Sequence, residues 1–137
     1  MTTTDITPDL AAFIDGLKFD ADGLIPAIAQ QHDSGEVLMM AWMNRESVRE
    51  TLTGGRVVYW SRSRRALWRK GDTSGQIQRL VELRADCDRD CLLLMVDQVG
   101  VACHTGRRSC FFTAIRDGAP KIVAEIVADP DKLYPAK

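Results

Sequence analysis

The sequence predicts an α+β fold that is mainly antiparallel β, with one or two helices. Three observations lead to this fold class: most apolar segments are too short for helices, a turn-forming run joins the first two of them, and one segment carries signals for both ends of a helix. The chain of 137 residues has the length of one compact domain, and no repeat or linker divides it. We therefore expect a single domain over residues 1–137, with residues 1–16 and 117–137 at its periphery.

Two strands and a helix are expected in the first half of the chain. Residues 24–30 and 37–43 are apolar, and the run between them predicts a hairpin turn. This run is His32, Asp33, Ser34 and Gly35. Asn44 can cap a helix over residues 44–53, which the glycine pair 54–55 then ends.

Four further segments are rich in β-branched, aromatic or leucine residues and short enough to be strands. They are residues 57–61, 77–83, 92–96 and 111–116. Residues 121–129 fit either a strand or a short helix. Strands therefore outnumber helices, whichever of the two forms at this last segment.

The composition excludes several classes of protein. Hydrophobic residues make up 45% of the chain and charged residues 27%, which argues against disorder, and a net charge of −1 argues against a general affinity for nucleic acid. Residues 1–10 lack the features of a secretory signal, and the longest strongly apolar run, residues 91–96, is too short to cross a bilayer. We expect a cytoplasmic protein with no membrane or nucleic-acid partner, whose four cysteines stay reduced.

The cysteines offer a candidate metal site. If Cys87 and Cys91 lie on an extended segment, their backbones are roughly 13 Å apart and cannot share one ion, although a helical turn would reverse this conclusion. Cys91 opens an apolar run, so we exclude Cys91. Cys103 and Cys110 enclose a polar run with a glycine that can fold back and bring them together. Three cysteine ligands would leave an open position for water on a catalytic zinc, but buried thiols without metal explain the pattern equally well.

Three aspartates alternate with other residues around Cys87. Asp86, Asp88 and Asp90 form a cluster typical of a hard cation such as magnesium. The run does not match a calcium-binding loop, because Cys91 stands where that loop needs glycine. A solvated acidic turn is the alternative interpretation.

A basic segment supplies candidate phosphate ligands. From Arg56 to Lys70 the chain holds no acidic residue, and hydroxyl groups that suit phosphate oxygens lie within and after this segment. Trp60 and Trp68 could stack on a base or could belong to the core. The candidate ligands are Arg62, Arg64 and Lys70 first, followed by Ser61, Ser63, Thr73 and Ser74.

Three blocks, taken together, closely resemble the phosphoribosyl-AMP cyclohydrolase family of histidine biosynthesis. They are residues 59–75, YWSRSRRALWRKGDTSG, residues 86–91, DCDRDC, and residues 103–111, CHTGRRSCF. The likeness extends from about residue 17 to residue 116. It implies a monofunctional enzyme, since the chain has no room for a fused pyrophosphatase domain.

The resemblance also implies metal ligands and an assembly. Zinc is bound by Cys87, Cys103 and Cys110, and magnesium by the three aspartates. Members of the family are intertwined homodimers, so there is one zinc per subunit, held by Cys87 of one chain with Cys103 and Cys110 of the other.

The implied reaction is the hydrolytic opening of the adenine ring of 1-(5-phosphoribosyl)-AMP at the N1–C6 bond by zinc-activated water. Its product is the phosphoribosyl-formimino-aminoimidazole carboxamide ribotide. Because imidazole titrates near working pH, we predict His104 to be the general base or acid beside Cys103. The rival hypothesis is a zinc-stabilised nucleic-acid-binding module, which would bind polynucleotides in a salt-dependent way and turn nothing over.

Overall fold

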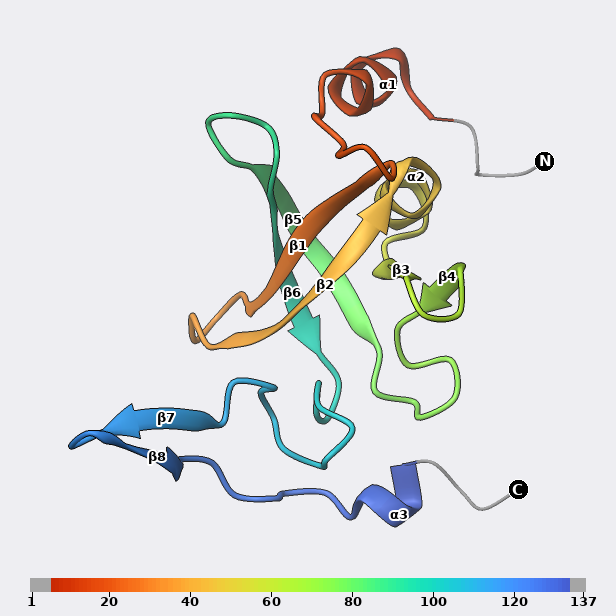
Figure 1. Cartoon of the computed structure of the whole chain (residues 1–137). Helices are drawn as coiled ribbons and strands as arrows, with labels where there is room; N and C mark the ends of the chain where they lie inside the picture. Colours follow the sequence, from red (N-terminus) through yellow and green to blue (C-terminus); the bar gives the residue numbers. More distant parts are fainter. Residues whose placement is uncertain (1–5, 134–137) are drawn as a thin grey trace.

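A six-stranded sheet forms the body of this computed structural model, which describes residues 6–133 (Figure 1). The strand order across the sheet is β4-β3-β2-β1-β6-β5. In chain order the strands are β1 (Leu24–Gln31), β2 (Val37–Asn44), β3 (Val58–Ser61), β4 (Ala66–Arg69), β5 (Gln78–Ala85) and β6 (Leu92–Gln98). A separate hairpin comprises β7 (Thr113–Arg116) and β8 (Ala119–Ile122), and the helices are α1 (Pro8–Asp15), α2 (Arg45–Gly54) and α3 (Pro130–Leu133).

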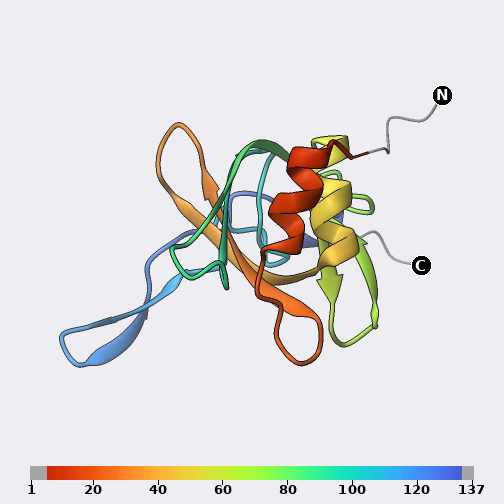
Figure 2. The ribbon, with the colours of Figure 1, turned by 90° about the horizontal axis from the view of Figure 1, so that it is seen from above.

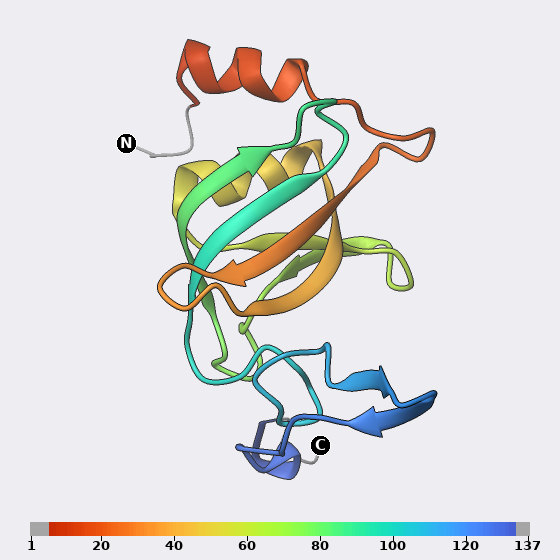
Figure 3. The same ribbon diagram turned by 90° about the vertical axis from the view of Figure 1, so that its left-hand side faces the viewer.

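The strand pairing is mainly antiparallel, as predicted. β1 and β2 form the expected hairpin, in which Leu24 pairs with Asn44. The exception is β1 with β6, which run parallel. The curled sheet also closes on itself, because Arg56 forms a bridge with Arg79 of β5 and the amide of Val57 donates to the carbonyl of Gln78 at 3.0 Å (Figure 3).

Helix α2 forms where its capping residues predicted a helix. The Asn44 side chain accepts from the amide of Ser47 at 2.8 Å, and the Ser47 hydroxyl accepts from the amide of Asn44 at 2.8 Å. Gly55 ends the helix in the left-handed conformation, with φ 79°. Helices α1 and α2 lie side by side in Figure 2 and are in contact. No helix among residues 6–133 is long and apolar enough to span a membrane.

Several sequence-based expectations need correction. Three helices form instead of one or two. The strand expected over 111–116 begins only at Thr113, and of the ambiguous segment 121–129 only the first two residues belong to a strand, β8, while the remainder is irregular. β4 was not predicted, because the three apolar residues between Arg65 and Arg69 carry little hydrophobic signal.

The core lies between the inner face of the sheet and the helices. Alternate residues of β1 point inward, as do those of β6, which is the period of two expected for strands with one buried face. The buried apolar residues of these two strands are Leu24, Ile25, Ala27 and Ala29, and Leu92, Leu94 and Val96. Ile14 of α1 is only 3% exposed, so helix α1 contributes to this core.

Candidate metal and substrate site

Cys103 and Cys110 lie in a loop that follows β6 and folds back on itself. The amide of Ala102 donates to the carbonyl of Arg108 at 3.0 Å, and the amide of Cys103 donates to that of Arg107 at 3.2 Å. This pairing brings the Cys103 thiol close enough to Cys110 to affect the pKa of Cys110. The loop therefore folds back as its glycine and polar residues predict.

Gly106 makes the tip of this loop possible. Its φ of 88° is left-handed, and a Cβ there would lie 2.0 Å from the carbonyl oxygen of Ala128. The amides of Val127 and Ala128 donate to the Gly106 carbonyl at 2.9 and 3.1 Å. The segment before α3 thus holds the tip, and no side chain fits at residue 106.

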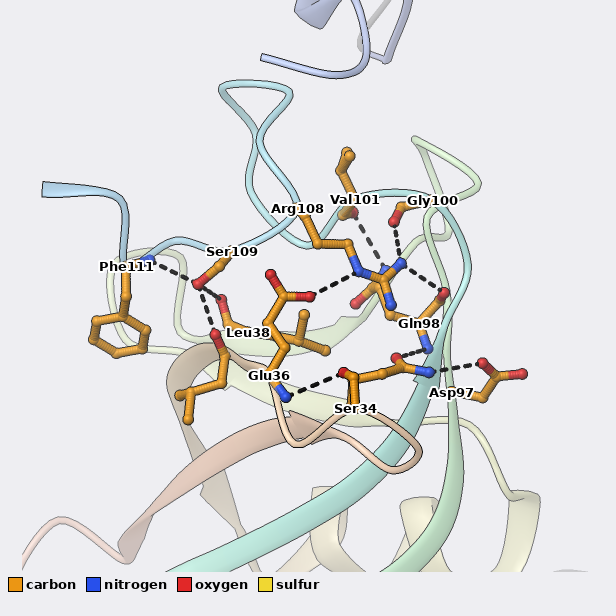
Figure 4. Close-up of polar contacts among 12 residues, drawn as sticks. Ser34, Glu36, Leu38, Asp97, Gln98, Gly100, Val101, Arg108, Ser109 and Phe111 are labelled. Carbon is orange, nitrogen blue, oxygen red and sulfur yellow. Dashed lines mark hydrogen bonds and ion pairs between the residues drawn. The ribbon is translucent and has the colours of Figure 1, made fainter. Parts of the chain in front are cut away.

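The second cysteine is fixed to the first residues of β2. The amide of Cys110 donates to the carbonyl of Leu38 at 2.7 Å, and the hydroxyl of buried Ser109 donates to the carbonyl of Val37 at 2.7 Å. Figure 4 shows Ser109 between Leu38 and Phe111. The amide of Phe111 donates to the hydroxyl of Ser109. Cys110 therefore has a backbone position set by the sheet.

Arg108 ties the loop to two other segments. Its Nε lies 3.3 Å from Oε1 of Glu36, and its guanidinium donates to the carbonyl of Gly100 at 2.7 Å (Figure 4). It also donates to the carbonyl of Gln98 at 3.3 Å. A single side chain thus links both ends of the cysteine loop to the β1–β2 turn.

A buried polar network supports the loop from the sheet. The hydroxyl of Tyr59 donates to Oε1 of Gln78 at 2.7 Å, and Nε2 of Gln78 donates to Oε1 of Gln98 at 2.9 Å. Nε2 of Gln98 in turn donates to the carbonyl of Val99 at 2.9 Å. Within residues 6–133 every buried side-chain nitrogen or oxygen has a partner, so this network specifies one loop position at no cost from unpaired groups.

The chemistry of the thiol pair fits a metal ion. Cys103 is buried and Cys110 exposed. The pKa of the Cys110 thiol is raised to about 12, first because its sulfur is partly desolvated and then because the Cys103 thiol lies nearby. The positive charge of Lys70 opposes this rise. Thr105 Oγ1 lies 3.0 Å from Cys103 Sγ and can donate a hydrogen bond to a thiolate there. No sequence motif predicted this contact. A zinc ion favours the deprotonated sulfurs that burial disfavours, so the pair is suited to supply two of its ligands.

The turn between β5 and β6, which contains Cys87, lies at the opposite end of the sheet from the cysteine loop (Figure 1). Cys87 thus precedes β6, whereas Cys103 lies beyond the end of β6, and seven extended residues span about 20 Å. Within residues 6–133, no three His, Cys, Asp or Glu side chains converge to hold a metal ion. One chain therefore brings Cys103 and Cys110 together but not Cys87 with them.

The turn over residues 86–91 corrects the argument that set Cys91 aside. Cys87 and Cys91 do not lie on an extended segment, because this turn joins β5 to β6 and the amide of Asp86 donates to the carbonyl of Cys91 at 3.0 Å. The separation of roughly 13 Å for extended backbone therefore does not apply. What still distinguishes Cys91 is its half-buried place directly before β6, where desolvation raises its pKa.

The aspartates occupy the same exposed turn. Desolvation, which would raise the pKa of Asp86, is outweighed by hydrogen bonds from Asp90 and from the amides of Cys91 and Arg89, so this pKa is lowered. The hydrogen bond between the carboxyl groups of Asp86 and Asp90, followed by desolvation and the charges of Asp86 and Asp88, raises the pKa of Asp90. The turn thus brings two carboxyl groups together with opposite pKa shifts, and Asp88 close enough to act on Asp90.

The basic segment surrounds two separate cavities. The first, of about 350 Å³, is lined by four of the seven candidate phosphate ligands, Arg64, Lys70, Thr73 and Ser74. The second, of about 330 Å³, is lined by Arg62 and Trp60 together with Asp22, Leu24 and Arg65. Ser61 and Ser63 lie at the β3–β4 turn, with their hydroxyl oxygens 3.4 Å apart, and line neither cavity. The structure therefore divides the candidates into groups that the sequence could not separate.

His104 is exposed on the cysteine loop, directly after Cys103. Thr105 and Gly106 follow it in the turn that the amide of Gly106 closes onto the carbonyl of Cys103 at 3.0 Å. An exposed imidazole at this position is accessible to water and to a substrate over the thiol pair. The role of general base or acid predicted for it from the sequence stays a prediction.

Comparisons with known proteins point to one family. A family model described as Phosphoribosyl-AMP cyclohydrolase matches residues 39–112. The chain is 71% identical over 128 residues to a phosphoribosyl-AMP cyclohydrolase of Rhodospirillum centenum, covering 93% of this chain and 96% of that relative. Relatives of the same name share 71% identity over 107 residues in Paracoccus denitrificans (78% of this chain, 88% of the relative) and 64% over 126 residues in Alkalilimnicola ehrlichii (92% and 89%). The range matched by the family model contains the cysteine loop, the aspartate turn and both cavities of the basic segment except Asp22 and Leu24.

Proposed function

The chain belongs to the phosphoribosyl-AMP cyclohydrolase family of hydrolases in histidine biosynthesis, and from this premise we propose a zinc-dependent opening of the adenine ring. Water adds to C6 of 1-(5-phosphoribosyl)-AMP and the N1–C6 bond breaks, giving the phosphoribosyl-formimino-aminoimidazole carboxamide ribotide. One observation carries the proposal: the paired thiols of Cys103 and Cys110 adjoin a basic cavity. Lys70 connects the two, since it lines the cavity and its charge acts on Cys110.

We assign zinc to Cys103, Cys110 and a Cys87 supplied by a second copy of the chain. A zinc ion with three thiolate ligands would provide Lewis-acid activation of water at its fourth position. The chain's own contribution is geometric: the backbone hydrogen bonds from Cys110 to Leu38 and from Cys103 to Arg107 fix the backbone of both cysteines. Reduced thiols at such a site agree with the cytoplasmic location expected from the sequence.

A homodimer is the assembly that this ligand set requires. Cys87 and the thiol pair lie at opposite ends of β6, so a two-fold arrangement of two copies would complete two equivalent sites. The segment after the cysteine loop supports such an interface, because five of its large apolar side chains are 53–72% exposed and the β7–β8 hairpin extends away from the sheet (Figure 1). These side chains are Phe111, Ile115, Ile122, Ile126 and Val127.

The two phosphates of the substrate match the two cavities. We propose that Arg64, Thr73 and Ser74 hold one phosphate in the first cavity, and that Arg62 in the second holds the other, with Ser61 and Ser63 at the turn between β3 and β4. Arg62 already lies over the ring of Trp42, 4.8 Å from its centroid, which fixes its direction.

Magnesium is proposed at the aspartate turn. The hydrogen bond with Asp86 is the main cause of the raised pKa of Asp90, and the charges of Asp86 and Asp88 add to it. A divalent cation would offset these charges. Asp88 would be the third ligand. In the dimer this turn would accompany Cys87 to the zinc site, so magnesium would lie near the substrate.

His104 is proposed to move a proton between water and the substrate. His104→Ala is expected to lower kcat by about a hundredfold or more while the zinc content stays at the wild-type level. Zinc analysis and turnover on the same sample check this. His32→Ala is the matched control, since His32 is exposed in the β1–β2 turn and has no proposed role. Loss of zinc from His104→Ala would instead make the residue structural.

The function itself is tested by incubating the purified protein with phosphoribosyl-AMP and following the ultraviolet absorbance change on ring opening. We expect turnover that a chelator abolishes and added zinc restores. Folded protein with zinc bound that shows no metal-dependent turnover would overturn the proposal. Salt-dependent binding of polynucleotides by such a sample would then favour the nucleic-acid-binding module.

A further inference from the structure

Lys70 is buried without a carboxylate partner among the described residues, which binding a phosphate would not require. Its residue is 2% exposed, although lysine is rarely buried without a partner for its charge. Its Nζ donates to the carbonyl of Gln76 at 3.3 Å and lies 5.9 Å from the centroid of the Trp68 ring. Among residues 6–133, no carboxylate forms an ion pair with this ammonium. A buried positive charge with one carbonyl acceptor requires a compensating negative charge.

The cysteine pair would supply that negative charge once a metal ion holds its sulfurs deprotonated. Burial lowers the pKa of Lys70, and the charges of Cys110 and Cys103 raise it. The effect is reciprocal, since the Lys70 ammonium lowers the pKa of Cys110. The charged groups that raise the pKa of the lysine are therefore the two sulfurs assigned to zinc.

Hydrogen bonds hold Lys70 and the cysteine loop in a fixed relation. The carbonyl of Gln76 accepts both from Lys70 Nζ and from Gln98 Nε2, the latter at 3.1 Å. The side chain of Gln76 accepts from the amide of Val101, two residues before Cys103, at 2.9 Å. Only glycine fits at residue 71, beside the lysine, because a Cβ there would lie 2.5 Å from the amide nitrogen of Ile77. The ammonium is thus held by the same network that holds the start of the cysteine loop.

We propose that Lys70 is a positioning residue of the metal site, whose buried ammonium offsets the excess negative charge of the metal-bound sulfurs, and not a ligand of the substrate's phosphates. Three thiolates and one Zn²⁺ carry a net charge of −1, which one ammonium neutralises. This inference rests on the proposed function, since it assumes zinc at Cys103 and Cys110. It assigns the lysine to the metal site and leaves phosphate binding in the first cavity to Arg64, Thr73 and Ser74.

The test replaces Lys70 in the full-length protein and measures zinc affinity by competition with a chromogenic chelator, together with kcat and KM. Lys70→Gln keeps a donor for the Gln76 carbonyl and removes the charge, Lys70→Met removes both, and Lys70→Arg keeps the charge. Arg64→Met is the matched comparison from the same cavity. Thermal unfolding of the zinc-free proteins reports whether each variant folds.

We expect Lys70→Gln and Lys70→Met to bind zinc about 10- to 100-fold more weakly and to lose kcat with little change in KM, while Lys70→Arg recovers most of the affinity. The thiolate-to-metal absorption of the Co²⁺-loaded protein should shift in the neutral variants. Arg64→Met should instead raise KM and keep the wild-type zinc affinity. Wild-type zinc affinity in folded Lys70→Gln, with a raised KM, would overturn the inference and return the lysine to phosphate binding. Absence of zinc from wild-type protein would sink the proposed function first, and this inference with it.

Discussion

Cys103→Ser is expected to abolish zinc binding and to lower turnover of phosphoribosyl-AMP by about a thousandfold or more, because activation of water by the metal supplies several kcal/mol of the barrier reduction. The serine hydroxyl is a poor replacement for a thiolate as a zinc ligand. The fold should survive, since the loop is held by backbone hydrogen bonds and by Gly106 and Ser109, whose contacts do not involve this sulfur. Zinc content, turnover and thermal unfolding of one preparation measure all three expectations.

Cys91→Ser provides the matched control. The substitution is the same, but Cys91 is half-buried at the start of β6 and lies outside the proposed ligand set. We expect wild-type zinc content and nearly wild-type turnover. This comparison matters because the distance argument that first excluded Cys91 fails at the turn over residues 86–91. A reversed result, in which Cys91→Ser loses zinc and Cys103→Ser keeps it, would show that the wrong cysteines were chosen.

The sequence predicts the parts of the fold that depend on local chemistry. The β1–β2 hairpin and helix α2 form where the turn run and the Asn44 cap place them, because such signals act within a few residues. Helix α1 was missed although Thr7 caps it and Pro8 begins it, since eight residues give a weak periodicity. The parallel pairing of β1 with β6 joins segments over sixty residues apart, and no local pattern encodes it.

The candidate site likewise has parts that local sequence predicts and parts that depend on tertiary contacts. The glycine-containing run between Cys103 and Cys110 predicts a loop that folds back, and it does so. The burial of Lys70 could not be read from its place after exposed Arg69 in a basic segment. It depends on tertiary contacts such as the one with the carbonyl of Gln76. Residue type likewise could not reveal that Cys87 lies about 20 Å of strand away from the thiol pair. That separation is a tertiary fact, and it is the reason for proposing a shared site.

A shared zinc site makes a second prediction with a large effect. Cys87→Ser and Cys103→Ser should each be inactive as pure homodimers, since every site then lacks one ligand. In a mixed dimer, one site would receive both substituted residues and the other would receive none. Random pairing makes half of the dimers mixed, with one intact site each, so the mixture should recover about a quarter of wild-type activity and zinc content. Tagging the two chains differently allows the mixed dimer to be purified, and it should then show about half.

The recovery of activity in coexpressed Cys87→Ser and Cys103→Ser chains is the most direct measurement of the central claim. The matched control coexpresses Cys103→Ser with Cys110→Ser, which lie in the same loop and should not complement each other. The account predicts about a quarter of wild-type turnover for the first pair and none for the second. Mixed dimers of the first pair that remain without zinc and without turnover would contradict a site shared between chains.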